Sequence, residues 1–420
     1  MTRTIFTLAL LGVSNVFGQL EEARRITETL CAPSFFGRGY VNNGMGAAAQ
    51  FLKEEFQHVG LAPISDEFGY FQSYSYDVNS FPGEMSVVHG DRTLLPGIHF
   101  LPDASSPSLS LTANYALIDS TILMDKELLK DAVESVYLGV KNSFLIDGKG
   151  FEEMEHQELI GYAFNFTSTA PTFVTTDQKF TWSVGRNQLK NPLILLQDSI
   201  FKRGLPLEVN IEAQFIEKFQ ANNVIGYLPG RKKCAKTIVF CAHYDHLGGL
   251  GKNTYIPGAN DNASGTAMLI TLADYFIKNP SDYNMLFIAF SGEEAGLLGS
   301  DYFVANTPIE LKKIRFVLNL DIMGSGEEGI TVVNATEYPK EFELLTAINQ
   351  EQSLLANVKS RGETSNSDHY FFHQNDVPSF FIYTMGANKN YHDVFDTYDA
   401  LSFEAYNNVM KLLQEFIERL

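Results

Sequence analysis

With 420 residues, of which 45% are hydrophobic and 19% charged, the chain is long enough for two domains and can bury a large core. Its 50 Asp and Glu outnumber its 31 Lys and Arg, which gives a net charge of −19. This charge argues against a nucleic-acid partner, which needs a basic face, and against docking on an anionic membrane. The sequence indicates no particular oligomeric state.

The first 18 residues are typical of a secretory signal peptide. Arg3 supplies a positive charge, residues 5–13 form a short apolar core, and Val16-Phe17-Gly18 offers a cleavage site. We therefore expect cleavage after Gly18 and export to the periplasm or the extracellular medium. A buried first helix or strand is the alternative. The apolar core is too short for a stable membrane anchor.

Three cysteines permit at most one disulfide within the chain. Cys234 and Cys241 flank one expected strand, whose extended backbone would hold them too far apart to bond. A disulfide would therefore have to involve Cys31.

The pattern of the chain changes twice after the signal segment. Residues 44–60 have apolar residues at helical spacing and end in Gly, so they predict a helix. Residues 76–218 carry β-rich and aromatic-rich stretches, broken by turn sequences, and predict an inserted β-rich domain. No cluster of metal-ligand residue types occurs in this insert.

From residue 222 onward, short apolar runs alternate with helical patterns. Strands are expected at 223–228, 237–242, 284–291, 315–320, 330–334 and 379–383, and helices at 263–277, 294–305, 339–351 and 403–420. Alternation of apolar strands with helices predicts an α/β fold, in which helices cover both faces of a sheet.

Acidic and imidazole side chains fall where these elements end. His243 and Asp245 follow one strand, Asp261 precedes a helix, Glu293 and Glu294 follow the next strand, Asp321 follows another, and His392 lies in a late loop. Ligands of such folds bind at the carboxyl ends of the strands. Each residue alone also fits a purely structural role, such as a helix cap or an acid in the first turn of a helix.

Together these residues indicate a metal site, because several carboxylates at one sheet edge would repel one another without cations. Two imidazoles with Asp and Glu suit Zn²⁺. Three carboxylates and two imidazoles exceed what one tetrahedral zinc with an open position needs, so they suit two zinc ions that share a carboxylate. Of the adjacent Glu293 and Glu294, one would bind metal and the other would remain free as a general base.

Six motifs carry a resemblance to a known family. They are "AHYDH", "GANDNASG", "FSGEEAGLLGS", "NLDIMG", "SDH" and "YHDVFDT", in this order along the chain. Together they resemble the M28 family of zinc peptidases, which includes aminopeptidases. The resemblance covers about 222–420 and, more weakly, 19–62.

The resemblance implies a role for each of the clustered residues. His243 and Asp321 would bind one zinc, Glu294 and His392 the other, and Asp261 would bridge both. Glu293 would be the general base, and Asp245 would be a carboxylate that orients His243.

The resemblance also implies a fold and a domain order. The fold would be a mixed central β-sheet sandwiched between helices, as in zinc exopeptidases. Residues 19–75 together with 219–420 would form the catalytic domain, and 76–218 falls where some members carry an inserted, PA-like domain.

Some positions depart from the family pattern or lack a role in it. Thr364 stands where some aminopeptidases of this family have a Tyr that steadies the oxyanion, so Tyr383 and Tyr391 are alternative candidates. Structural roles are expected for His246 and His369.

We therefore expect a secreted di-zinc exopeptidase that acts on peptides, most simply an aminopeptidase. The alternatives are a carboxypeptidase or dipeptidase of the same family, a glutaminyl-cyclase-like acyltransferase with one zinc, and a receptor-like relative without catalysis. The complete set of five ligands favours the di-zinc enzyme.

Overall fold

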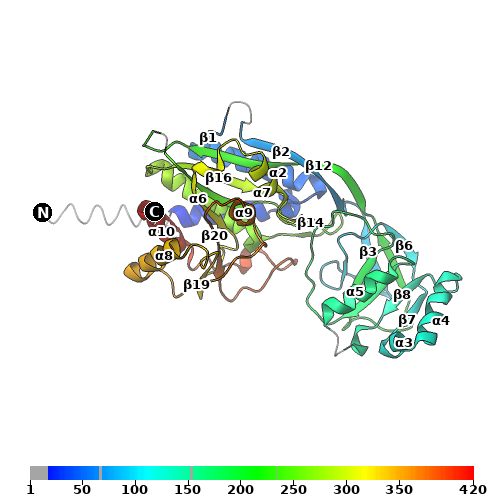
Figure 1. Ribbon diagram of the computed structural model, residues 1–420. Coiled ribbons are helices and arrows are strands. Elements are labelled where there is room, and N and C mark those ends of the chain that lie inside the picture. The colour runs from blue at the N-terminus through cyan, green and yellow to red at the C-terminus, as the bar shows by residue number, and fades with distance from the viewer. Residues whose placement is uncertain (1–17, 66–68, 152–154, 234) are drawn as a thin grey trace.

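The computed structural model describes residues 18–65, 69–151, 155–233 and 235–420 (Figure 1). The predicted signal segment, apart from Gly18, lies outside these residues, as does Cys234. Cys31 and Cys241 are free cysteines. Among the described helices, none is both long and apolar enough to cross a membrane.

A mixed sheet forms the centre of the larger part of the molecule. Within the described residues it has nine strands, in the order β1-β12-β16-β13-β17-β20-β18-β19, with β2 also paired to β12. The strands are β1 (Ala62–Pro63), β2 (Phe71–Ser80), β12 (Gln214–Leu228), β13 (Thr237–His243), β16 (Asn284–Phe290), β17 (Ile314–Leu320), β18 (Gly329–Val333), β19 (Val358–Ser360) and β20 (Ser379–Met385).

The direction of the central strands brings their carboxyl ends to one edge of the sheet. β13 runs parallel to both β16 and β17, and β17 runs parallel to β20. β12 and β18 pair antiparallel with β16 and β20. The residues that follow β13, β16 and β17 therefore meet at the same edge.

Helices cover both faces of this sheet because its inner strands are apolar on both sides. Along β13, Phe240 and Ala242 pack into one core, whereas Val239 and Cys241 pack into another. The first core includes helices α2 (Gly44–Val59), α6 (Gly265–Lys278), α8 (Pro339–Gln352) and α10 (Tyr406–Arg419), and the second includes α7 (Leu298–Ala305) and α9 (His369–Gln374). These layers confirm the predicted α/β fold, with a mixed sheet between helices.

Three helices begin later than the sequence predicts. α10 was expected from 403 but begins at Tyr406, and the other two delays leave an irregular turn at the sheet edge. α7 was expected from 294 but begins at Leu298, because Gly296 and Leu297 have positive φ angles of 103° and 60°. α6 was expected from 263 but begins at Gly265, after an irregular turn over Ala259–Ser264. Side chains in these turns project from the sheet edge rather than from a helix face.

Two smaller sheets occupy the chain between β2 and β12. One joins β3 (Met85–His89), β4 (Arg92–Leu94), β6 (Leu109–Thr112) and β11 (Leu207–Ile211), and the other joins β5 (Phe100–Pro102), β7 (Tyr115–Ile118), β8 (Ser143–Ile146), β9 (Thr172–Thr176) and β10 (Leu193–Gln197). Helices α3 (Ser120–Met124), α4 (Lys126–Tyr137) and α5 (His156–Phe166) also lie here. The paired strands β2 and β12 carry the chain out to this region and back (Figure 1).

Candidate metal site

The acidic and imidazole residues predicted from the sequence meet at the carboxyl edge of the central sheet. His243 is the last residue of β13, and Asp321 directly follows β17. Asp261 lies in the irregular turn before α6, and Glu294 lies in the turn between β16 and α7. His392 reaches the same place from the loop after β20.

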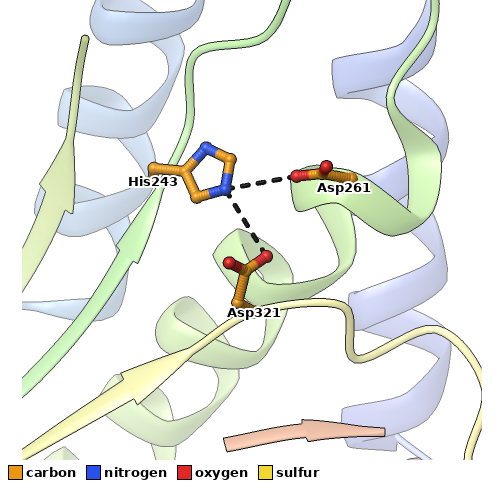
Figure 2. Close-up of side chains that lie close together, drawn as sticks. All are labelled: His243, Asp261 and Asp321. Atoms are coloured by element: carbon orange, nitrogen blue, oxygen red, sulfur yellow. Dashed lines mark ion pairs between the residues drawn. The ribbon is translucent and has the colours of Figure 1, made fainter. Parts of the chain in front are cut away.

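One group of side chains surrounds the ring of His243. Its Nε2 lies 3.2 Å from Oδ1 of Asp261 and 3.4 Å from Oδ1 of Asp321 (Figure 2). All three residues are buried. Figure 2 shows the two carboxylates converging on the same ring nitrogen from two different turns.

A second group surrounds the ring of His392. Its Nε2 lies 3.1 Å from Oδ2 of Asp261 and 3.1 Å from Oε2 of Glu294. Asp261 therefore presents one oxygen to His243 and the other to His392. Each imidazole also has a carboxylate of its own, Asp321 or Glu294.

Asp245 supports the site through its backbone and its side chain. Nδ1 of His243 lies 3.2 Å from the main-chain oxygen of Asp245 and 3.9 Å from its carboxylate. The carboxylate accepts hydrogen bonds from the backbone N–H groups of Glu293 and Glu294, at 3.2 and 3.4 Å. The family resemblance implies that the carboxylate orients His243. In the structure the carbonyl makes the closer contact with the ring, and the carboxylate, at 3.9 Å, also holds the turn with both glutamates.

Comparison with known proteins identifies the segment that carries this site. Residues 223–417 match the family described as Peptidase family M28. These residues are an M28 peptidase domain. The domain contains all seven residues that the sequence analysis placed in the site.

Curated relatives align with part of this chain. It is 30% identical over 176 residues to Aminopeptidase YwaD of Bacillus subtilis, across 41% of this chain and 37% of that protein. It is 27% identical over 226 residues to Leucine aminopeptidase 1 of Arthroderma otae, across 50% of this chain and 60% of that protein. The alignments thus span less than two thirds of the relatives' lengths.

Solved structures share the fold over nearly the whole chain. A zinc aminopeptidase from Bacillus subtilis superposes with a TM-score of 0.68 at 18% identity, across 95% of this chain and 94% of that chain. An aminopeptidase from Aneurinibacillus sp. strain AM-1 superposes with a TM-score of 0.63 at 21% identity, across 95% and 93%. The shared fold includes the region between β2 and β12 as well as the M28 domain.

The donor set of the M28 domain fits zinc. His243, Asp261 and Asp321 bring possible ligand atoms within 4.8 Å of one another, and so do His243, Glu293 and Glu294. Imidazole nitrogens and carboxylate oxygens are ordinary zinc ligands. Both rings also make a hydrogen bond through Nδ1, to Asp245 or Trp182, which leaves Nε2 directed at the carboxylates.

The electrostatics of the site favour positive charge between the carboxylates. Burial opposes the ionisation of Asp261, but hydrogen bonds from His243 and His392 outweigh it and hold the pKa of Asp261 well below its ordinary value. Burial likewise disfavours the charged form of His392. The carboxylates around the ring, Glu294 first among them, outweigh burial and raise the pKa of His392 to about 11. Asp261 thus keeps its negative charge beside the two imidazole rings, and zinc ions would stabilise that charge in the same way.

Glu293 differs from these acids. Burial of its carboxyl group raises the pKa of Glu293 well above its ordinary value, and the nearby Glu294 adds to this. The ion pairs among the described residues include Glu294, with His246 and His392, but do not include Glu293. The two adjacent glutamates therefore have different surroundings.

His246 belongs to the site, although the sequence predicted only a structural role for it. Its Nδ1 lies 2.7 Å from Oε1 of Glu294, so Glu294 contacts His246 through one oxygen and His392 through the other. The sequence signal was its position just beyond the strand end, beside His243. His369 is as fully buried as His246, but its ring packs against Phe381, with ring centroids 5.3 Å apart.

The candidates for steadying an oxyanion lie in different surroundings. Thr364 bonds to Asn366, and the hydroxyl of Tyr383 accepts a hydrogen bond from Arg361 at 3.2 Å. The ring of Tyr391 stacks on His392 with centroids 3.9 Å apart. Of the three, Tyr391 is the one with a direct contact to a residue of the site.

Several supporting residues were given no role in the sequence analysis, although Ser367 and Asp396 lie in the "SDH" and "YHDVFDT" motifs. Asp396 accepts hydrogen bonds from the backbone N–H groups of Asn260 and Asp261, and Ser367 donates one to Oδ2 of Asp321 at 3.2 Å. The fully buried Arg38 donates hydrogen bonds to the carbonyls of Tyr244, Leu30, Pro257 and Gly258. Arg38 thereby ties the turn after His243 to the turn before Asp261.

We predict that Arg38→Met lowers the free energy of unfolding by about 3 kcal/mol or more, because it leaves several buried carbonyls without a donor. Denaturant unfolding would measure the change. Arg419→Met is the control, since Arg419 lies at the surface with Glu351 and Glu415, and it should leave stability nearly unchanged. Equal stability of both variants would contradict the bracing role of Arg38.

Proposed function

We propose that this protein is an exported di-zinc aminopeptidase that removes N-terminal residues from peptides. The observation that carries the proposal is the position of Asp261, whose two oxygens face two different imidazoles. A carboxylate placed in this way suits a bridge between two ions. The names of the curated relatives, both aminopeptidases, support attack at the amino terminus. Export rests on the N-terminal sequence pattern.

In this proposal the ligands divide into two sets. His243 and Asp321 hold one zinc, Glu294 and His392 hold the other, and Asp261 bridges them. Bound there, the ions would polarise the scissile carbonyl and acidify the attacking water. Two divalent ions together with three carboxylates would have a small net positive charge. This charge would stabilise the negative charge that develops on the scissile carbonyl oxygen.

Glu293 serves as the general base in this proposal. Burial raises the pKa of Glu293 and so favours its uptake of a proton, and Glu293 lacks the ion pairs that engage Glu294. Glu293 takes a proton from the attacking water and passes it to the leaving amine. Asp245 fixes the backbone of Glu293 and so places this carboxylate beside the ions.

The region 76–218 is, in this proposal, an inserted PA-like domain within a catalytic domain of residues 19–75 and 219–420. Its two sheets, and the return of the chain through the β2–β12 pair, support this division. The three helices of this region add to the β-rich pattern that the sequence predicted.

We predict two zinc ions per chain and loss of peptide hydrolysis on chelation, with recovery when Zn²⁺ is added. Zinc should be counted by elemental analysis, and products identified by mass from a panel of free and N-terminally blocked peptides. An aminopeptidase cleaves the free peptides and leaves the blocked ones intact. Hydrolysis that persists after verified removal of metal would contradict the proposal. One zinc ion per chain would favour the cyclase-like alternative, and no bound zinc would favour the receptor-like alternative.

We predict that Glu293→Gln keeps both zinc ions and slows turnover by about 10²–10⁴-fold, because the amide cannot accept the proton. Substrate binding should change much less than turnover. Glu294→Gln is the matched variant, since it weakens a ligand and should lower the zinc content itself. Zinc per chain and turnover should be measured for both variants. If Glu293→Gln loses metal and Glu294→Gln loses only rate, the two residues have the opposite roles.

A further inference from the structure

The ring of His392 is held by a residue from the inserted region. Nδ1 of His392 lies 3.0 Å from the main-chain oxygen of Trp182, and the backbone N–H of Trp182 donates to the main-chain oxygen of His392 at 2.9 Å. One residue, 210 positions earlier in the chain, therefore contacts both the ring and the backbone of His392.

These contacts matter because a histidine ligand is oriented by the hydrogen bond of its other ring nitrogen. When Nδ1–H is donated to Trp182, Nε2 keeps its lone pair and faces Asp261 and Glu294. The ring of His243 has an equivalent acceptor, but it is the carbonyl of Asp245, two residues away in the same turn. One histidine is thus oriented locally and the other by a distant segment.

Trp182 is itself fixed inside the inserted region. Its indole N–H donates to the carbonyl of Pro102 at 3.0 Å, and its ring packs against Phe81 with centroids 5.8 Å apart. The same apolar core includes Leu247 and Leu250, from the segment that follows His246, and has Val394 packed against it. The core of the inserted region therefore extends beneath two loops of the metal site.

Lys179 makes a second attachment to the loop that carries His392. Its ammonium group pairs with the carboxylate of Asp393 and donates to the carbonyl of Lys389 at 2.9 Å. The Asp393 carboxylate is only 2% exposed and accepts hydrogen bonds from the backbone N–H groups of Tyr391 and Phe395. Lys179 thus supplies the cation that a buried carboxylate needs, at the residue next to His392.

We propose that Lys179 and Trp182 are positioning residues of the metal site, through which the inserted region controls the zinc held by His392 and Glu294. The inference rests on the proposed function, because it takes His392 as a zinc ligand. The zinc held by His243 and Asp321 has no ligand attached to this segment, so it should respond much less. The inserted region is in this view a structural part of one of the two zinc sites.

Zinc binding of Lys179→Met at buffered free Zn²⁺ tests this inference without measuring activity. We expect the affinity of one of the two ions to fall by about 10–100-fold, the usual effect of removing a group that orients a ligand, while the other ion stays bound. Lys179→Arg should bind zinc nearly as the wild type does. In an Asp321→Asn background, which weakens the other site, Lys179→Met should reduce binding of both ions.

The matched control is Lys252→Met. Lys252 pairs at 2.6 Å with Glu84, next to the start of β3, so it also joins the two regions, but through a residue remote from His392 in sequence. This variant should bind both ions normally. Thermal unfolding of each variant would show that the fold is kept. Should Lys179→Met not fold, Trp182→Phe, which removes the indole donor to Pro102, should weaken the same ion.

Three results would overturn the inference. They are wild-type binding of both ions by folded Lys179→Met, equal weakening of both ions, and the same loss in Lys252→Met. If the wild-type chain itself binds fewer than two zinc ions, the proposed function fails and this inference fails with it.

Discussion

Buried carboxylates at one edge of the sheet need a positive charge among them, and much of the surrounding structure serves this constraint. Asp261, Glu294 and Asp321 converge there, and in the described residues the rings of His243 and His392 lie between them. Isolated, such acids would become neutral by taking up protons. Contacts with imidazoles hold the pKa values of Asp261 and Glu294 below their ordinary range, whereas burial raises the pKa of Asp321. The same arrangement gives two divalent ions a set of ligands.

β16, β13 and β17 run parallel to one another, so the residues that follow them meet at one edge of the sheet. Irregular turns then direct the acidic side chains toward one another. Because the strands are buried on both faces, they are mostly apolar along their length, with Asn319 of β17 as a buried exception, and the acids stand at or beyond their ends. Positive φ angles at Gly292 and Leu297 place both glutamates before α7 instead of within it. Asp245 then holds their backbone, so that Glu294 pairs with His392 while Glu293 makes none of the ion pairs seen among the described residues.

The sequence predicted the central strands well, because their apolar runs are long and sharply bounded. It also named five residues that the structure brings together, because each stands beside the end of an expected element or in a loop that follows one. Helix starts were less accurate where a turn with a positive φ angle intervenes, as before Leu298. The contact between His246 and Glu294, the bonds of Arg38 and the carbonyl of Trp182 could not be predicted. They join residues far apart in the chain, and main-chain acceptors leave no trace in residue identity.

His243 and His392, two of the histidines of the site, show how an inserted region can become part of a catalytic domain. A ring oriented by its own turn depends only on local folding, as His243 does with Asp245. A ring on a long loop has no such neighbour, and the loop after β20 gives His392 a positive φ angle of 52° without a regular element around it. An external acceptor then fixes the ring, and a charged contact fixes its loop. Since both come from the region between β2 and β12, the orientation of His392 depends on that region in a way that the orientation of His243 does not.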